Sequence, residues 1–202
     1  MIHLLQTWLQ KIYRIDSPLA SLENYLLSRD ELKDCLGEES DWLDAEELVT
    51  FSQTNGECHL GLYLAPSIYH RDQRQFSTHQ IMTQIEGISH CLLLSCRAQA
   101  EQPTTQLEME LQAEIDKFLF FRLALPGSQS CRAYYHLKRP ANLKTLSYDQ
   151  KNLYQQAHQL ARRYCHFLET RYFAFHSVDP LLEELRSFYR LSHWQKLRVL
   201  AA

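Results

Sequence analysis

A glutamate and a histidine stand four positions apart in the otherwise apolar segment "QIEGISHCLLL", residues 84–94. Glu86 and His90 would share one face of a helix, because residues four positions apart lie about one turn apart. A carboxylate and an imidazole placed in this way could bind a zinc or iron ion, or act as an acid–base pair. Together with Glu114 from the next predicted helix, they are the first candidates for a metal or catalytic site.

The spacing around this pair departs from the patterns of known metal enzymes. Zinc proteases carry His-Glu-x-x-His, and di-iron bundles carry Glu-x-x-His on each of two helices. Neither pattern occurs in this sequence. Glu114 and Asp116 also point about 200° apart on a helix, so they cannot both face one site.

A structural interpretation competes with the metal hypothesis. If residues 77–99 and 104–125 form two antiparallel helices joined by "AEQPT", Glu86 would lie opposite Lys117, and His90 near Gln112 and Glu114. Buried charges occur mostly in pairs, because an isolated one is costly. Gly87 supports close packing here, since a glycine inside a helix costs about 1 kcal/mol relative to alanine. We therefore favour buried polar pairs and expect no cofactor.

The elements that must position these groups are mostly helices. Apolar periodicity predicts helices over 2–14, from Ser17 through 32, and over 77–99, 104–125, 149–173, 180–190 and 193–200. Asn55-Gly56 between two alternating runs predicts a β-hairpin, and residues 131–138 are the candidate third strand. The predicted fold is a single α+β domain over residues 1–202, in which a central antiparallel helical hairpin packs with a small antiparallel sheet.

Composition excludes several classes of protein. The chain is 45% hydrophobic and 22% charged, which is typical of a globular protein rather than a disordered one. No apolar run approaches the roughly 20 residues that span a bilayer, and no signal-peptide pattern is visible at the start. The six cysteines form no CxxC pair, which fits a reducing compartment. We expect a cytoplasmic protein without membrane contact.

Charge is distributed unevenly along the chain. Residues 1–131 carry a net charge of −10, whereas residues 132–202 carry +7. A basic, aromatic surface suits nucleic acid or an acidic partner, although it also suits ordinary amphipathic helices. The candidate binding surface is formed by five arginines: Arg162, Arg163, Arg171, Arg186 and Arg190.

A cysteine site in the same region is a weaker candidate. His158, Arg162 and Cys165 share one helical face, and nearby arginines could activate a thiol. A cysteine in the middle of a helix lacks the exposed turn on which such nucleophiles usually lie. The five glycines form no phosphate-binding loop motif.

The sequence thus favours a cytoplasmic interaction or regulatory protein without enzymatic activity. Its partner is expected to be another protein or a second copy of the chain. The alternatives are a metal-dependent enzyme with a Glu/His site on the central helices, and a nucleic-acid-binding protein that uses the basic C-terminal helices.

Overall fold

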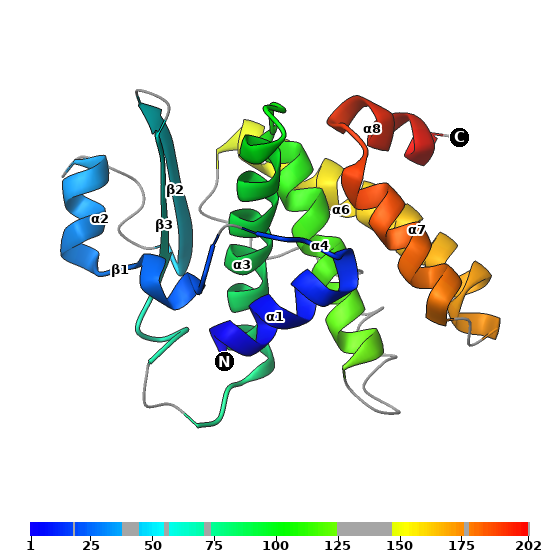
Figure 1. The fold of residues 1–202 in the computed structure, drawn as a ribbon, viewed down its shortest axis with the longest axis horizontal. Coiled ribbons are helices and arrows are strands. Elements are labelled where there is room, and N and C mark those ends of the chain that lie inside the picture. Colours follow the sequence, from blue (N-terminus) through cyan, green and yellow to red (C-terminus); the bar gives the residue numbers. More distant parts are fainter. Residues whose placement is uncertain are drawn as a thin grey trace. The chain divides into compact units, whose positions relative to one another are not determined.

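The computed structural model describes residues 1–17, 19–37, 45–54, 57–70, 74–124, 147–175 and 178–201. They form a mostly helical α+β fold with a small sheet (Figure 1). The elements gather into two compact units, Met1–Gln10 with Asp16–Glu101, and Lys11–Ile15 with Gln102–Ala202. Each unit is described by itself, and the expectation of a single domain stays a prediction. Among the described helices, none is both long and apolar enough to cross a membrane.

The first unit contains the sheet and the helix that covers it. Its elements are most of α1 (Ile2–Tyr13), a 3-10 turn η1 (Leu22–Tyr25), β1 (Leu26–Leu27), α2 (Arg29–Leu36), β2 (Glu47–Thr54), β3 (Glu57–Leu64) and α3 (Thr78–Gln99). The strand order is β1-β3-β2. The predicted hairpin is confirmed, because β2 pairs antiparallel with β3.

The sheet is mixed and not antiparallel throughout, which corrects the prediction. β1 pairs in parallel with β3, with Leu26 opposite Leu62. This strand could not be predicted, because two residues are too few to show an alternating pattern. The candidate third strand, residues 131–138, lies outside the described residues.

The predicted helix from Ser17 through residue 32 is also wrong. The structure has the η1 turn, then β1, and only then α2, which begins at Arg29. Ser28 caps α2 in a capping box, in which its hydroxyl accepts from the Glu31 N–H and the Glu31 carboxylate accepts from the Ser28 N–H. This local arrangement stops the apolar periodicity of residues 19–27 from continuing as a helix.

Helix α3 packs on the two long strands at a glycine. A Cβ atom added to Gly87 would lie 2.6 Å from Leu62 Cδ1 and 3.0 Å from Glu47 Cγ. The close approach predicted at Gly87 is therefore confirmed. The sequence suggested the second central helix as the neighbour, whereas the contact described here is with the sheet.

The second unit is helical. It contains the end of α1, then α4 (Gln106–Leu123), α6 (Tyr148–Arg171), a 3-10 turn η4 (Phe173–Phe175), α7 (Val178–Arg190) and α8 (His193–Ala201). Stacked rings fill much of its core, with Tyr164 against Phe188 at 3.9 Å and Tyr13 against Tyr189 at 4.3 Å between centroids. The predicted Ser192 cap of α8 is confirmed by its bond from the Gln195 N–H.

A buried polar network links three helices of the second unit. Lys196 on α8 donates to Glu108 on α4 at 2.9 Å, and both side chains are fully buried. Lys196 also donates at 3.4 Å to the side-chain oxygen of Gln112, Oε1. The Gln112 amide donates to Tyr13 at 2.9 Å and to Asp116 at 3.0 Å, and the Tyr13 hydroxyl donates to Asp116. The network thereby fixes α8 and the end of α1 on α4.

Adding a methyl group at Gly87 tests the packing of α3 on the sheet. Gly87→Ala should destabilise the chain by about 1–3 kcal/mol, because overpacking outweighs the gain of about 1 kcal/mol in helix propensity. Combined with Leu62→Ala, which removes the clashing atom, it should cost at least about 1 kcal/mol less than the sum of the two single changes. Urea denaturation measures both, and strict additivity would contradict the contact.

Breaking the buried ion pair tests the polar network. Lys196→Met should cost about 3–5 kcal/mol, because the Glu108 carboxylate would stay buried without its cation. Replacing both partners, Lys196→Met with Glu108→Leu, should recover most of that loss. Chemical denaturation measures the free energy of unfolding of each variant. A double variant as unstable as Lys196→Met alone would contradict the assigned ion pair.

Candidate functional site

One exposed seam runs along most of the length of α6. Its residues follow alternating steps of four and three, which keeps them on one face of the helix. All of them are exposed: Tyr148, Asn152, Gln155, Gln159, Arg162 and His166. The opposite face is apolar and buried through Ala157, Ala161, Tyr164 and Leu168. The same periodicity that buries one side of α6 therefore presents a polar and basic seam on the other.

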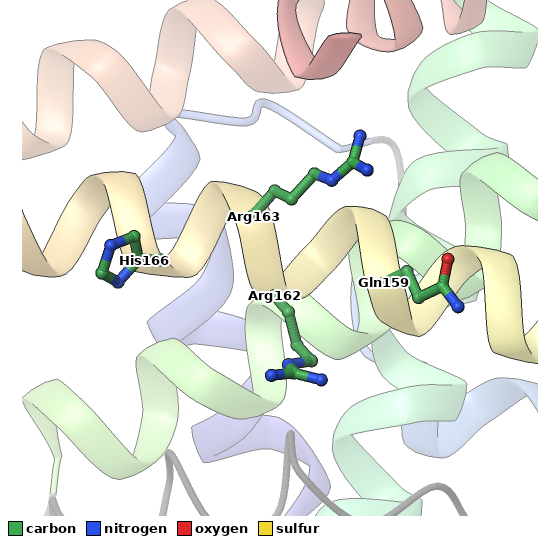
Figure 2. Close-up of a pocket in the computed structure, with 4 residues that line it drawn as sticks. All are labelled: Gln159, Arg162, Arg163 and His166. Carbon is green, nitrogen blue, oxygen red and sulfur yellow. The ribbon is translucent and has the colours of Figure 1, made fainter.

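A surface pocket of about 570 Å³ lies on this seam. Among the described residues, its lining comes from Gln159, Arg162, Arg163 and His166 (Figure 2). In Figure 2 the two arginines leave α6 on opposite sides of the ribbon, with Gln159 and His166 to either side of them along the helix. The four groups thus spread over the face, and a single small anion would not fill it. We call these four residues the basic face of α6.

Few carboxylates lie near the basic face along α6 itself. No acidic residue occurs between Asp149 and Glu169. The Glu169 carboxylate accepts from Arg122 Nε at 2.8 Å, and the Arg122 guanidinium also lies 4.6 Å over the Phe173 ring. The nearest carboxylate along the helix is therefore already neutralised.

The two arginines of the basic face differ in their contacts. Arg163 donates at 3.5 Å to the carbonyl oxygen of Leu200, in the last turn of α8. Arginine near a helix C-terminus is favourable, because the last carbonyl groups carry partial negative charge. Arg162 forms no hydrogen bond or ion pair within the part of the chain that the structure describes. Its charge is the one most available to a ligand.

The other three predicted arginines are placed differently. Arg186 donates to the carbonyl of Ile12 at 2.9 Å, and Arg190 reaches the carbonyls of Tyr13 and Arg14 at 3.4 Å. These contacts cap the C-terminal end of α1, so Arg186 and Arg190 stabilise the fold. Arg171 is exposed at the end of α6, away from the pocket lining.

The two residues predicted on α3, Glu86 and His90, lie near a third polar group that sequence reasoning missed, the carboxylate of Glu47. A carboxylate oxygen of Glu86 and a ring nitrogen of His90 lie within 4.8 Å of one another. Glu47, the first residue of β2, places its Oε1 atom 3.6 Å from His90 Nδ1. The side chains of His90 and Glu47 are only 6% and 13% exposed. Sequence reasoning missed Glu47 because it lies about 40 residues before His90 in the chain. Only the pairing of the strands brings it beside α3.

Glu114 pairs within its own unit. Its Oε1 atom accepts from Lys117 at 2.9 Å, and its Oε2 atom from His158 Nδ1 at 3.0 Å. Burial alone would raise the pKa of Glu114, but Lys117 and His158 outweigh it and lower the pKa to about 2. Glu114 is therefore an ionised structural carboxylate.

The weaker candidate, a thiol site at Cys165, finds no support in the state of that residue. The thiol is fully buried, and burial raises its pKa well above the usual value, with Glu114 and Glu169 raising it further. A protonated, inaccessible thiol is a poor nucleophile. Cys165 therefore acts as a small core residue.

Several predicted pairs combine residues of both units and stay predictions. These are Glu86 with Lys117, His90 with Glu114 or Gln112, and the metal set of Glu86, His90 and Glu114. Sequence reasoning also missed the Lys196–Glu108 ion pair. The signal was present, since a lysine interrupts the apolar face of residues 193–200, but its partner lies 88 positions away.

Comparison with known proteins gives no assignment. No protein-family model, no curated protein and no solved structure shows a significant match to this chain. Function must therefore be inferred from the geometry alone.

Neutralising Glu114 should produce a pH-dependent loss of stability. Its pKa is about 2 in the folded chain and about 4.5 when unfolded, so its stabilising effect is complete above pH 4.5 and disappears as the pH falls towards 2. Glu114→Gln should cost about 2–3 kcal/mol at pH 7, with the difference from the original chain shrinking below pH 4.5. Urea denaturation across this pH range measures it.

Glu183→Gln is the matched control, because Glu183 is exposed on α7. It should change stability by less than about 0.5 kcal/mol at every pH. A Glu114→Gln deficit that persists unchanged at pH 2.5 would contradict the assigned ion pairs.

Proposed function

We propose that this chain is a cytoplasmic, non-enzymatic interaction protein that binds an acidic segment of a partner protein along α6. The observation that carries the proposal is the basic face, with its pocket lined by Gln159, Arg162, Arg163 and His166. The Arg162 guanidinium is exposed and none of the described residues pairs with it, and such a group can hold a carboxylate in a bidentate manner.

The shape of the surface favours an elongated partner. α6 has 24 residues and is therefore about 36 Å long, and the seam extends over most of that length. A partner helix with carboxylates at steps of three and four could lie along the seam, since helices pack side by side through such rows. Asn152, Gln155 and Gln159 would offer hydrogen bonds to its polar groups.

Tyr148 supplies an anchor at one end of the seam. Its side chain is 78% exposed, whereas most aromatic rings of the second unit are packed against one another. Tyrosine and arginine are the residue types most often found to dominate binding energy at protein interfaces. The seam therefore combines a ring, amide groups and positive charge in one row.

Nucleic acid is the alternative partner for the same charges. Phosphates would engage Arg162 and Arg163, but stacking on bases requires accessible rings beside them. The ring adjacent in sequence, Phe167, is 39% exposed but packs against Tyr164 and Tyr172. The more exposed ring of Tyr148 lies 14 residues before Arg162, which is about 21 Å along the helix. A base stacked on Tyr148 would therefore lie far from the two arginines, and we favour the acidic protein segment as the partner.

Removing the two charges of the basic face tests the proposal. Each exposed ion pair contributes up to about 1 kcal/mol, so Arg162→Gln with Arg163→Gln should weaken binding of a labelled poly-glutamate peptide about tenfold or more. Binding of the original chain should also weaken as salt rises. Fluorescence anisotropy at several salt concentrations gives both results.

Arg171→Gln is the matched control for Arg162→Gln alone, because each variant removes one positive charge from α6 and Arg171 lies outside the pocket lining. Arg171→Gln should leave the affinity within about twofold. Equal losses from Arg171→Gln and Arg162→Gln would reduce the effect to net charge. Tight binding of a single-stranded oligonucleotide without binding of poly-glutamate would replace the protein partner by nucleic acid, and no binding of either would overturn the proposal.

A further inference from the structure

The sheet of the first unit has two edge strands of very different length. β1 has two residues and β2 has eight, and both lie beside the central strand β3. We propose that the outer edge of β2 pairs with β2 of a second copy of the chain, so that the two sheets join into one. The inference does not depend on the proposed function of α6, because β2 and α6 belong to different compact units.

Alternate residues of β2 point their main-chain groups away from β3. The Ala65 N–H donates to the carbonyl of Glu46 at 2.9 Å, and these two residues continue the one-to-one register of β2 with β3. Hydrogen-bonded and non-bonded pairs alternate along an antiparallel ladder, so the main-chain groups of Val49 and Phe51 face outward. No residue in the part of the chain that the structure describes forms a hydrogen bond with these outward groups.

β2 lacks the features that usually protect an edge strand. Natural edge strands are kept short, bulged or covered, or they carry lysine or proline. The register of β2 is one-to-one from Glu47 to Thr54, so it contains no bulge. Residues 48–54 contain no charged residue, proline or glycine, and they include β-branched and aromatic residues that favour strands. Phe51 and Ser52 are also exposed. The outer edge of β2 is therefore open to another strand.

A second copy of β2 matches this edge in register. In an antiparallel pair centred on Thr50, Val49 of each chain lies opposite Phe51 of the other, and the outward main-chain groups of both strands meet. Glu47 then lies opposite position 53, which is a glutamine, so no two carboxylates face each other. Pairs of an aromatic and a β-branched side chain stabilise a sheet, and the two-fold symmetry forms this pair twice. Phe51, which is 39% exposed in the single chain, becomes covered in both copies.

The charges at the start of β2 favour a copy over a charged foreign strand. The side chain of Glu47 is only 13% exposed and lies near His90 on α3. Glu46, just before the strand, lies 2.9 Å from His79. A basic segment would therefore find few available carboxylates along β2, whereas the uncharged residues 48–54 suit an identical uncharged strand.

Pairing through β2 produces a closed dimer rather than a growing chain of copies. Both copies use the same residues, which is the isologous contact of a two-fold dimer. The joined sheet contains the three strands of each copy and has β1 at both ends. β1 is two residues long and is followed directly by α2, which begins at Arg29, so it offers little edge for a further strand.

Sedimentation equilibrium of the full chain at increasing concentration tests the proposal. The original chain should reach the mass of two chains and no more. Phe51→Lys should weaken the dimer about tenfold or more, because it places an unpaired charge opposite Val49 of the other copy and lysine disfavours edge pairing. Val49→Pro should act in the same direction, because it removes an outward N–H that only the dimer uses and leaves the ladder with β3 intact.

His59→Lys is the matched control for Phe51→Lys. His59 is exposed on the same hairpin, but it belongs to the central strand β3. The variant adds the same charge away from the outer edge and should leave the dissociation constant within about twofold. Circular dichroism shows whether each variant is folded.

Hydrogen exchange of the original chain gives a readout that needs no variant. The amides of Val49 and Phe51 should exchange more slowly at high protein concentration, where the dimer forms, than at low concentration. A monomer at every concentration up to about 1 mM would overturn the proposal, even if β2 then bound a foreign strand. Open-ended oligomers, unchanged exchange of these two amides in a dimer, or equal weakening by His59→Lys and Phe51→Lys would overturn it as well.

Discussion

The second unit depends on one fully buried ion pair between Lys196 and Glu108. Such a pair is costly to desolvate, and it is tolerated only because Gln112 and the rings of Phe188 and Tyr189 surround the ammonium group. The geometry is therefore specific, since small displacements of α8 would leave two charges buried without compensation.

The position of α8 determines what α6 presents to solvent. With α8 held in place, the Leu200 carbonyl lies within reach of Arg163 and engages one of the two adjacent guanidinium groups. Arg122 pairs with the Glu169 carboxylate and thereby neutralises its charge. What remains on α6 is a row of amide and basic groups with no carboxylate between Asp149 and Glu169. The basic face is thus a consequence of pairing elsewhere in the unit, and not of a high net charge of the chain.

The regular elements could be predicted from the sequence where a local signal existed. The periodicity of α3, α4 and α6, the hairpin of β2 with β3 and the Ser192 cap each depend on neighbours in sequence, and the structure agrees with them. The pairing of β1 with β3 and the capping of α1 by Arg186 join residues that are far apart in the chain. Local patterns carry no information about such contacts.

The candidate sites were predictable only in part, for the same reason. Arg162, Arg163 and His166 share a helical face that spacing alone reveals, so their common exposure could be expected. The roles of Arg186 and Arg190 could not, because a capping arginine and a ligand-binding arginine look alike in a sequence. Glu47 joined Glu86 and His90 only once the sheet register was known. Residue type shows what chemistry is available, whereas burial and pairing decide which groups remain available for it.

The most direct measurement is an NMR titration that follows the Nε–H signals of the arginine side chains as an acidic helical peptide is added. Docking on α6 predicts that the signal of Arg162 shifts in a saturable manner, while those of Arg186 and Arg190, which lie outside the pocket lining and donate to backbone carbonyls, stay in place. Uniform small shifts of all arginine signals, or saturable shifts confined to other arginines, would contradict a binding role for the basic face.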